Sequence, residues 1–354
     1  MNPSSQSCPT DSLRPQRDPQ FKAEMPLIEQ VVQRQFGLVD LEPLALRSWN
    51  AHFRARGSDG LYHVKVVRVS GPEEDLINQF RYTAELLQRL QDLGCPYVIS
   101  PLRSVDGSFS AQVAGWLVCA FPWNDHLAKD GLPEEGCQPA PIIGRAALML
   151  AHLHDLSTSL MLNAACPQRR SPYAYSPAEW RQHSRRLWVI AECRLRHQRA
   201  SEHTLTMLRQ AQRATQRLFT ECPPFFQAPP SWVVVHGDYR PENLTIGLTA
   251  ENSWICDFDH AHPSCREVDA AYGALSFAGP RWFTGRRDWS ACALFIREYE
   301  AGLSRGSLDL EAMSIALRYV LLKALSLSFK EEQVRDRFPL YLELCTVLNK
   351  GLIG

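Results

Sequence analysis

One stretch of the chain, HGDYRPEN at residues 236–243, combines side chains that can do chemistry with the spacing of a tight turn. It follows an apolar run at 233–235 that predicts a short buried strand, and Gly237 allows the chain to turn sharply after it. Asp238 therefore lies at the end of a strand, and Asn243 follows five residues later. A carboxylate and an amide in this position can act as a proton acceptor and as a ligand for a hard cation.

A second apolar segment, residues 254–256, ends directly in Asp257. A hairpin between this segment and residues 244–246 would bring Asn243 and Asp257 close to Asp238. Carboxylate and amide oxygens are the ligands that Mg²⁺ prefers, together with water and phosphate oxygens. A carboxylate that does not bind the metal can accept a hydroxyl proton, which is the division of roles found in phosphoryl transfer.

Each of these pieces is common by itself. An isolated His-Gly-Asp is usually a turn, and Asp-Phe-Asp is usually the end of a strand. Their order is more specific, because a strand, HGDYRPEN and a second strand ending in DFD follow a first half that offers a lysine in a hairpin and a glutamate on a helix. The sequence therefore favours a phosphoryl-transfer site over two unrelated turns.

The first 120 residues predict a small α+β unit that would position this lysine. The expected elements are, in order, a helix, a hairpin, a helix and two strands, over residues 27–39, 44–69, 75–93, 97–105 and 112–121. Gly37 is expected to end the first helix, and Asp59-Gly60 to form the hairpin turn. Lys65 lies in the second strand of that hairpin.

The second half of the chain reads as mainly helical. Helices are expected over residues 142–156, 177–218, 289–303, 308–329 and 338–350. Residues 122–141 are rich in proline and glycine without any period, which indicates a boundary. We expect a flexible tail, an N-terminal nucleotide-binding unit, a linker, and a C-terminal catalytic and substrate unit, over residues 1–26, 27–121, 122–141 and 142–354.

The bulk composition excludes some partners. The chain has 38 basic and 38 acidic side chains, so no net charge points to nucleic acid or to an anionic membrane. Its 11 cysteines are scattered singly with no C-x-x-C pair, which favours reduced thiols. Residues 1–26 lack the apolar core of a secretory signal, and residues 315–329 are too short and too charged to span a membrane. We expect a cytoplasmic protein without a nucleic-acid or membrane partner.

The segments HGDYRPENLTIG and ICDFDHAHPSCREVDAAYGALSF resemble the aminoglycoside phosphotransferase and choline kinase-like family. These are small-molecule kinases with a bilobal, protein-kinase-like α+β fold. DGLYHVKVVR, AELLQRLQDLGCPYV and IGRAALMLAHLHDLS resemble the family's lysine-bearing strand, its next helix, and the helix before its substrate region. The resemblance covers residues 27–350. It implies an enzyme that uses Mg²⁺ and moves the γ-phosphate of ATP, or of another nucleoside triphosphate, to a hydroxyl group of a small molecule.

The resemblance also implies roles for single residues. Asp238 would be the catalytic base that orients and deprotonates the substrate hydroxyl. Asn243 and Asp257 would hold Mg²⁺ on the phosphates of the nucleotide, and Lys65 would contact the α- and β-phosphates. The backbone around Phe121 would bind adenine.

Supporting roles follow in the same way. His236 would pack beneath the catalytic loop, and Asp269 would bond to the backbone of that loop. Asp259 is ambiguous, with support of the site favoured over metal binding.

Two features depart from the family pattern. Glu85 is the natural ion-pair partner of Lys65 by its place on the helix, but a helical wheel puts it opposite the apolar stripe, so pairing and solvent exposure both stay open. The turn expected over the phosphates, residues 47–57, has Gly57 as its single glycine. Asn50 and His52 are the candidates to replace the missing backbone contacts.

The acceptor is not identified by the sequence. Residues 151–220 contain eleven arginines, no lysine and four acids, which argues against a polycationic acceptor such as an aminoglycoside. Solvated faces of a long helix are the favoured explanation of this excess of arginine, ahead of a site for an anion. Trp282 and Phe283, beside a run of arginines, could border an acceptor pocket or pack in the core.

Three hypotheses compete. The first is a kinase for a small hydroxylated molecule, such as a sugar, an amino alcohol, an amino acid or a natural product. The second is a catalytically weak pseudo-kinase that serves as a binding or scaffolding module, which the poor glycine content of residues 48–57 favours. The third is a protein kinase, which shares the chemistry but is disfavoured because the chain lacks an APE-like segment and a long activation loop.

Overall fold

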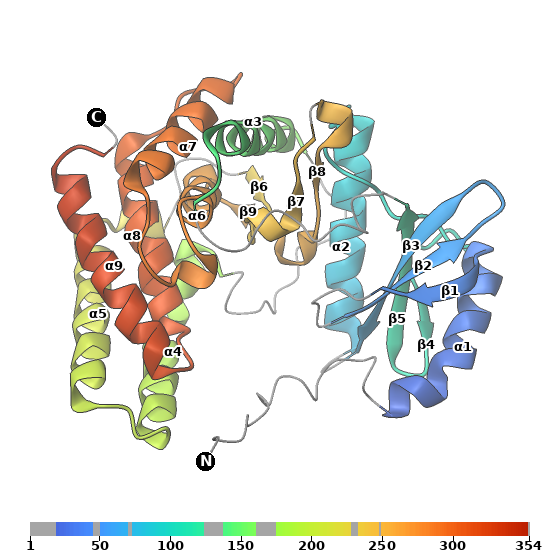
Figure 1. Ribbon diagram of the computed structural model, residues 1–354, viewed down its shortest axis with the longest axis horizontal. Helices are drawn as coiled ribbons and strands as arrows, with labels where there is room; N and C mark the ends of the chain where they lie inside the picture. The colour runs from blue at the N-terminus through green and yellow to red at the C-terminus, as the bar shows by residue number, and fades with distance from the viewer. Residues whose placement is uncertain are drawn as a thin grey trace, which may run out of the picture. The chain divides into compact units, whose positions relative to one another are not determined.

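The computed structural model describes residues 19–44, 50–69, 73–123, 137–160, 175–227, 233–247 and 249–352. The expectations for residues 1–18 of the tail, 45–49 of the phosphate-side turn and 124–136 of the linker lie outside these residues. The chain divides into two compact units. The first contains α1, α2 and β1–β5, and the second contains α3–α9 and β6–β9 together with residues 93–97 (Figure 1).

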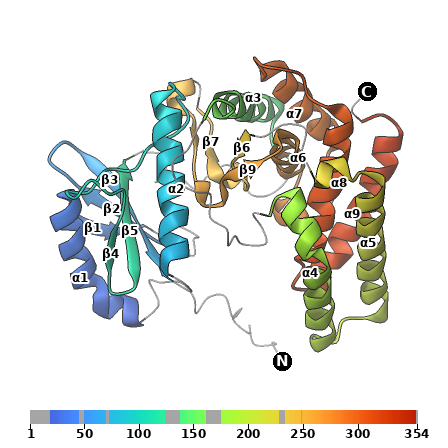
Figure 2. The same ribbon diagram turned by 180° about the vertical axis from the view of Figure 1, so that it is seen from behind.

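The first unit is an antiparallel sheet with a helix on each face. Its strands are β1 Val39–Pro43, β2 Ala51–Arg56, β3 Leu61–Arg68, β4 Ala111–Val113 and β5 Trp116–Pro122. They lie in the order β1-β2-β3-β5-β4. The helices are α1 Pro19–Phe36 and α2 Glu73–Asp92, on opposite sides of the sheet (Figures 1 and 2).

Alternation along the strands decides which residue meets which helix. On β5, Val118 belongs to the buried cluster under α1, whereas Leu117 and Cys119 pack with Phe80 of α2. Lys65 lies directly opposite Cys119 in the register between β3 and β5. The side chain of Lys65 therefore lies on the same face of the sheet as Cys119, which is the face that α2 covers.

The first unit begins earlier in the chain than the sequence indicated. The expected tail over residues 1–26 overlaps α1, which is helical from Pro19 onward. Phe21 is buried there against Trp116, with ring centroids 4.9 Å apart, and against Phe53. Phe53 and Trp116 are distant from Phe21 in the sequence, so no local pattern predicted that a helix would begin before residue 27.

The strand expected over residues 97–105 is wrong. The structure gives this segment no strand, and Leu102 makes a single backbone hydrogen bond to Ala120. Pro101 lacks an N–H group, which prevents a regular ladder. The strand that pairs with β5 is instead β4, joined to it by a turn in which Ala114 and Gly115 both have positive φ. The edge strand β1 was not expected at all.

The second unit is mainly helical, with two small sheets. Its helices are α3 Ala140–Ser157, α4 Pro177–His197, α5 Glu202–Glu221, α6 Arg266–Phe277, α7 Trp289–Gly302, α8 Leu310–Ser326 and α9 Glu331–Asn349. Its strand pairs are β6 Val233–Val235 with β9 His262–Ser264, and β7 Leu244–Thr245 with β8 Trp254–Ile255. A sheet unit followed by a mainly helical unit confirms the α+β class.

One expected helix is in fact two. The pattern over residues 177–218 is interrupted between α4 and α5, where Arg199 has a left-handed backbone with φ 57°. Ser201 then caps α5 by accepting a hydrogen bond from the backbone N–H of Thr204. Within the described ranges, no helix is long and apolar enough to cross a membrane.

Candidate functional site

The β7–β8 hairpin brings the two motif segments together, as the sequence predicted. Leu244 pairs with Ile255 in this hairpin. Just before and after the paired residues, the backbone N–H of Cys256 donates to the carbonyl oxygen of Asn243 over 2.8 Å. Asn243 and Asp257 are therefore neighbours across the hairpin.

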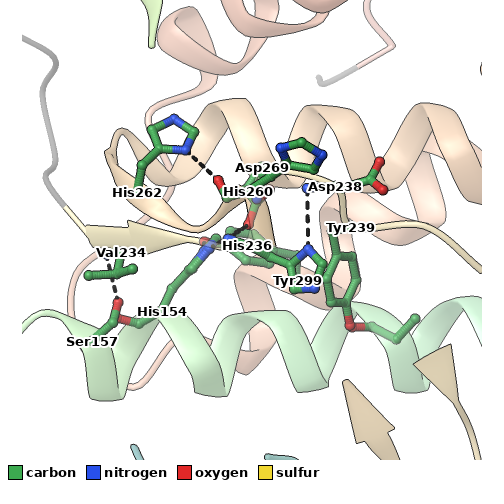
Figure 3. A network of polar contacts seen from close by, with 12 residues as sticks. His154, Ser157, Val234, His236, Asp238, Tyr239, His260, His262, Asp269 and Tyr299 are labelled. Atoms are coloured by element: carbon green, nitrogen blue, oxygen red, sulfur yellow. Dashed lines mark hydrogen bonds and ion pairs between the residues drawn. The ribbon is translucent and has the colours of Figure 1, made fainter. Parts of the chain in front are cut away.

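Asp269 of α6 holds the loop that carries Asp238. Its Oδ2 accepts a hydrogen bond from the backbone N–H of His236 over 2.7 Å, and its Oδ1 accepts one from Gly237 over 3.1 Å. His154 of α3 lies on the other side, with Nε2 3.2 Å from Oδ2, and its Nδ1 is 2.7 Å from the hydroxyl of Tyr299 (Figure 3). Asp269 thus bonds to the backbone of the loop, which confirms its expected supporting role.

The charge of Asp269 suits this role. Complete burial acts to raise the pKa of its carboxyl, but the hydrogen bond and charge of His154, with the adjacent His236, hold that pKa below its ordinary value. A buried carboxylate that accepts two backbone N–H groups fixes the direction of the loop.

His236 packs beneath the loop, also as expected. Its side chain is fully buried, and its ring lies 4.7 Å from the ring of Phe258. Because the backbone N–H of Asp238 donates to Nδ1 over 3.2 Å, the ring proton is on Nε2, which donates to the carbonyl of Cys256 over 2.8 Å. His236 thus ties the loop that carries Asp238 to the strand end that carries Asp257.

The carboxylate of Asp238 is almost buried and has defined neighbours. Oδ1 accepts a hydrogen bond from the hydroxyl of Tyr272 over 2.8 Å. Oδ2 accepts one from Nδ2 of Asn243 over 3.0 Å, and Nε of Arg240 lies 3.0 Å from the same oxygen. The Nδ2 group of Asn243 also donates to the backbone oxygen of Asp238 over 2.8 Å. Asp238 therefore engages both amide hydrogens of Asn243, and Oδ1 is the atom of this side chain that could bind a cation.

Asp257 has a strained backbone conformation. Its φ of 64° and ψ of 58° lie in the left-handed region, which non-glycine residues rarely adopt. Its side chain is exposed, and Asp259, two residues on, is half-buried.

The donor set fits a magnesium ion that is shared with a nucleotide. In the described part of the chain, no three His, Cys, Asp or Glu side chains gather as a metal site. A cation here would rest on the Asn243 amide oxygen and the Asp257 carboxylate, with phosphates and water completing its shell. Mg²⁺ usually binds in this manner, through one or two protein ligands and substrate phosphates.

The candidates in the first unit share the α2 face of its sheet. Lys65 is 8% exposed there. Next to it, His63 stacks on His52 with ring centroids 5.0 Å apart and on Phe121 at 5.9 Å. Burial, with the charges of His52 and Lys65, lowers the pKa of His63 well below its ordinary value.

The other two candidates also belong to the first unit. Asn50 directly precedes β2. Glu85 of α2 is half-buried. This burial decides neither for an ion pair with Lys65 nor for full exposure to solvent.

Sequence reasoning missed two neighbours of Asp238. Arg240 lies inside the motif, and only the course of the loop shows that its side chain turns back to the carboxylate. Tyr272 lies three residues after Asp269, so the helical period that places both on one face of α6 was an available signal.

The model of a phosphotransferase enzyme family matches residues 40–309 of the chain. The chain belongs to this family. The sequence-based expectation of a phosphotransferase enzyme is thereby confirmed. No curated protein sequence matches the chain significantly.

Solved structures of other phosphotransferases share the fold. A microcompartment-associated aminopropanol kinase has a TM-score of 0.61 at 18% identity, covering 93% of this chain and 97% of that chain. An amicoumacin kinase in complex with AMP-PNP and Ca²⁺ has a TM-score of 0.57 at 13% identity, covering 86% of each chain. An ethanolamine kinase from Plasmodium vivax has a TM-score of 0.54 at 14% identity, covering 94% of this chain and 91% of that chain. The kinase-like fold class is therefore confirmed.

Proposed function

We propose that this phosphotransferase uses ATP and Mg²⁺ to phosphorylate a hydroxyl group of a small molecule. The observation that carries the proposal is the arrangement around Asp238. A nearly buried carboxylate orients the amide of Asn243, and the hairpin joins Asn243 to the strand end that carries Asp257. A proton acceptor beside two oxygen ligands for a metal ion is what phosphoryl transfer requires.

Each residue has a separate task. Asp238 accepts the proton of the acceptor hydroxyl, and Asn243 and Asp257 hold the metal ion. When bound, Mg²⁺ supplies positive charge to the phosphate oxygens. Lys65 contacts the α- and β-phosphates as a buried cation. Asp269 acts only by holding the loop, because its carboxylate is used by backbone N–H groups.

The remaining assignments concern the nucleotide. The backbone around Phe121 binds adenine, Asn50 supports the phosphates, and Glu85 orients Lys65. The stack of His52, His63 and Phe121 next to Lys65 supports an aromatic place for a base on the same face of the sheet.

The relatives support both the nucleotide and the acceptor class. The amicoumacin kinase binds AMP-PNP and Ca²⁺, a nucleotide analogue and a divalent cation. The aminopropanol and ethanolamine kinases act on small amino alcohols by their names. A small hydroxylated molecule is accordingly the acceptor class that we propose.

Asp238→Asn tests the proposal. We expect this variant to lose acceptor-dependent ADP formation by a factor on the order of 100 to 10,000, the usual contribution of a general base. Its affinity for ATP with Mg²⁺, measured by thermal shift, should stay near the wild-type value, since Asp238 does not hold the metal. Acceptors to screen are ethanolamine, aminopropanol, simple sugars and hydroxy acids.

Asp257→Ala serves as the companion variant. It should abolish the Mg²⁺-dependent part of the ATP-induced rise in melting temperature. Normal turnover by Asp238→Asn would refute the proposed base. No thermal shift of the wild type at millimolar nucleotide would favour a binding or scaffolding module instead.

A further inference from the structure

Lys323 of α8 is a cation with most of its hydrogen-bonding capacity unused. Its side chain is half-buried, and its Nζ donates a hydrogen bond to the carbonyl oxygen of Tyr175 over 2.9 Å. An ammonium group has three N–H donors, and within the described ranges this is the single hydrogen bond that Lys323 makes. The same Nζ lies 5.5 Å from the centre of the Tyr319 ring. Two donors and a positive charge can therefore bind a further ligand.

The packing of α4 on α8 fixes the position of this lysine (Figures 1 and 2). Trp180 of α4 spans the turn of α8 that carries Lys323. Its ring centroid lies 5.2 Å from that of Tyr319, and its Nε1 donates to the hydroxyl of Ser326 over 3.2 Å. Because residues 319, 323 and 326 share one face of a helix, Lys323 lies on the face that meets α4. The ammonium is thus positioned before any ligand binds.

The acids that act on Lys323 already serve other groups. Glu179 of α4 accepts a hydrogen bond from the backbone N–H of Ser176 over 2.8 Å, as part of the cap of this helix. Asp269 of α6 is used by the loop backbone and by His154 (Figure 3). Burial lowers the pKa of Lys323 to about 7, and both acids act in the opposite direction without restoring the ordinary value. A cation that its own protein neutralises so incompletely is typical of a ligand site.

Helix α6 connects this cation to the proposed base. The hydroxyl of Tyr272 in α6 donates to Asp238 over 2.8 Å. Asp269, whose charge acts on Lys323, lies one turn earlier in the same helix. The electrostatic influence of the ammonium therefore extends to the helix turn next to the one that contacts the base.

The loop after α6 makes a second connection. The ring of Trp282 lies over the guanidinium of Arg240, with 4.6 Å from Cζ to the ring centre, and Arg240 lies beside the proposed base. The carbonyl oxygen of Trp282 accepts a hydrogen bond from Arg337 over 3.0 Å. Arg337 also donates to the carbonyl of Ala324, the residue after Lys323, over 2.8 Å. The proposed base and this turn of α8 thus belong to one neighbourhood of the helical unit.

We propose that Lys323 binds an anionic group of the acceptor, and that the acceptor is a hydroxylated acid, with a carboxylate or a phosphate besides its reactive hydroxyl. The inference rests on the proposed function and names its substrate class. The ammonium offers its two remaining N–H donors to the anion, while Tyr175 and Tyr319 keep it in place. Charge-assisted hydrogen bonds at one end of a small molecule orient its other end, here the hydroxyl at Asp238.

The test measures the binding of acceptors with and without an anionic group, in the presence of Mg²⁺–ADP. Glycerate, glycerol 3-phosphate and glycerol form one set, and serine and serinol form a second. By calorimetry, the wild type should bind at least one anionic member more tightly than its neutral counterpart, on the order of 10- to 100-fold, as for a hydrogen bond to a charged group. Lys323→Met should lose this preference. The better ligand of glycerate and glycerol 3-phosphate shows whether the anion is a carboxylate or a phosphate.

Two further variants keep the result interpretable. Lys323→Arg retains a cation at this place and should keep part of the preference, although its donors have another geometry. Lys350→Met is the matched control, an exposed lysine, and should keep the wild-type preference. Unfolding does not explain a loss in Lys323→Met, because removal of a buried charge should stabilise the fold.

The outcomes separate this inference from the proposed function. A wild type without preference for the anionic members, or a preference that Lys323→Met retains, would overturn the role of Lys323 and leave the proposed function intact. A wild type that binds no Mg²⁺–ADP would overturn the proposed function and this inference with it.

Discussion

Gly237 is the residue at which the loop backbone leaves no room for a side chain. Its φ is +79°, and an added Cβ would lie 2.4 Å from the carbonyl oxygen of His260. Gly237→Ala therefore combines left-handed strain, about 1–2 kcal/mol, with a backbone clash. We expect a fall in the free energy of unfolding beyond that strain, together with loss of transfer activity, because the loop that carries Asp238 must move.

The control for this variant is Gly37→Ala. Gly37 has a similar φ of +68°, but an added Cβ would meet nothing within 4 Å. It should therefore lose stability through strain alone and keep its activity. Urea unfolding of both variants gives the comparison, and equal losses would show that the contact with His260 is unimportant.

Single residues were predictable where the chemistry is local. The order of Asp238, Asn243 and Asp257 within short segments predicted that these residues lie close together, and the hairpin that joins their two segments follows from two apolar runs. The contact of Arg240 was not predictable, and the contact of Tyr272 was indicated only by the helical period that it shares with Asp269. They depend on the course of the loop and on how α6 packs beneath it, which no single segment encodes.

At the scale of elements, α8 contains a charge that its surroundings disfavour. The Nζ of Lys323 donates to the carbonyl of Tyr175 over 2.9 Å and lies 5.5 Å from the centre of the Tyr319 ring. Burial lowers the pKa of Lys323 to about 7, although Glu179 and Asp269 act to raise it. The folded state thus binds this proton less tightly than the unfolded state.

The sign of the pH effect follows from linkage. The cost of the buried ammonium is fully present below pH 7, and it disappears as the pH rises toward the unfolded value of about 10.4. Lys323→Met should therefore raise the free energy of unfolding most at pH 6 and least near pH 10. Denaturant midpoints across this range measure it, with the exposed Lys350→Met as the control. A gain that does not depend on pH would contradict the assigned pKa.

Elements were predicted well where periodicity is strong and poorly where a non-local partner decides. The hairpin of β2 and β3 and the helix α2 followed from their patterns. The false strand over residues 97–105 and the undetected edge strand β1 did not, because pairing in a sheet depends on a neighbour that is distant in sequence.

At the scale of the whole molecule, the chain divides into two compact units, and the change in composition after β5 had led us to expect a boundary there. Each unit has its own buried core, with Val66 in the first and Leu321 in the second, both fully buried. Two such cores are expected to unfold in two calorimetric steps. Val66→Ala and Leu321→Ala should each lower the midpoint of one step, which assigns the steps to the units.

This assignment allows a test of whether both units take part in binding the nucleotide. If Lys65 of the first unit and Asp257 of the second hold the same ATP, a ligand that binds only the folded chain must raise both midpoints by mass action. Lys65→Met should reduce both rises, while Val66→Ala should keep them and merely start from a lower first midpoint. A nucleotide that raises the second midpoint alone would show that Lys65 has no part in the site, and the phosphates would then be held entirely by groups of the helical unit.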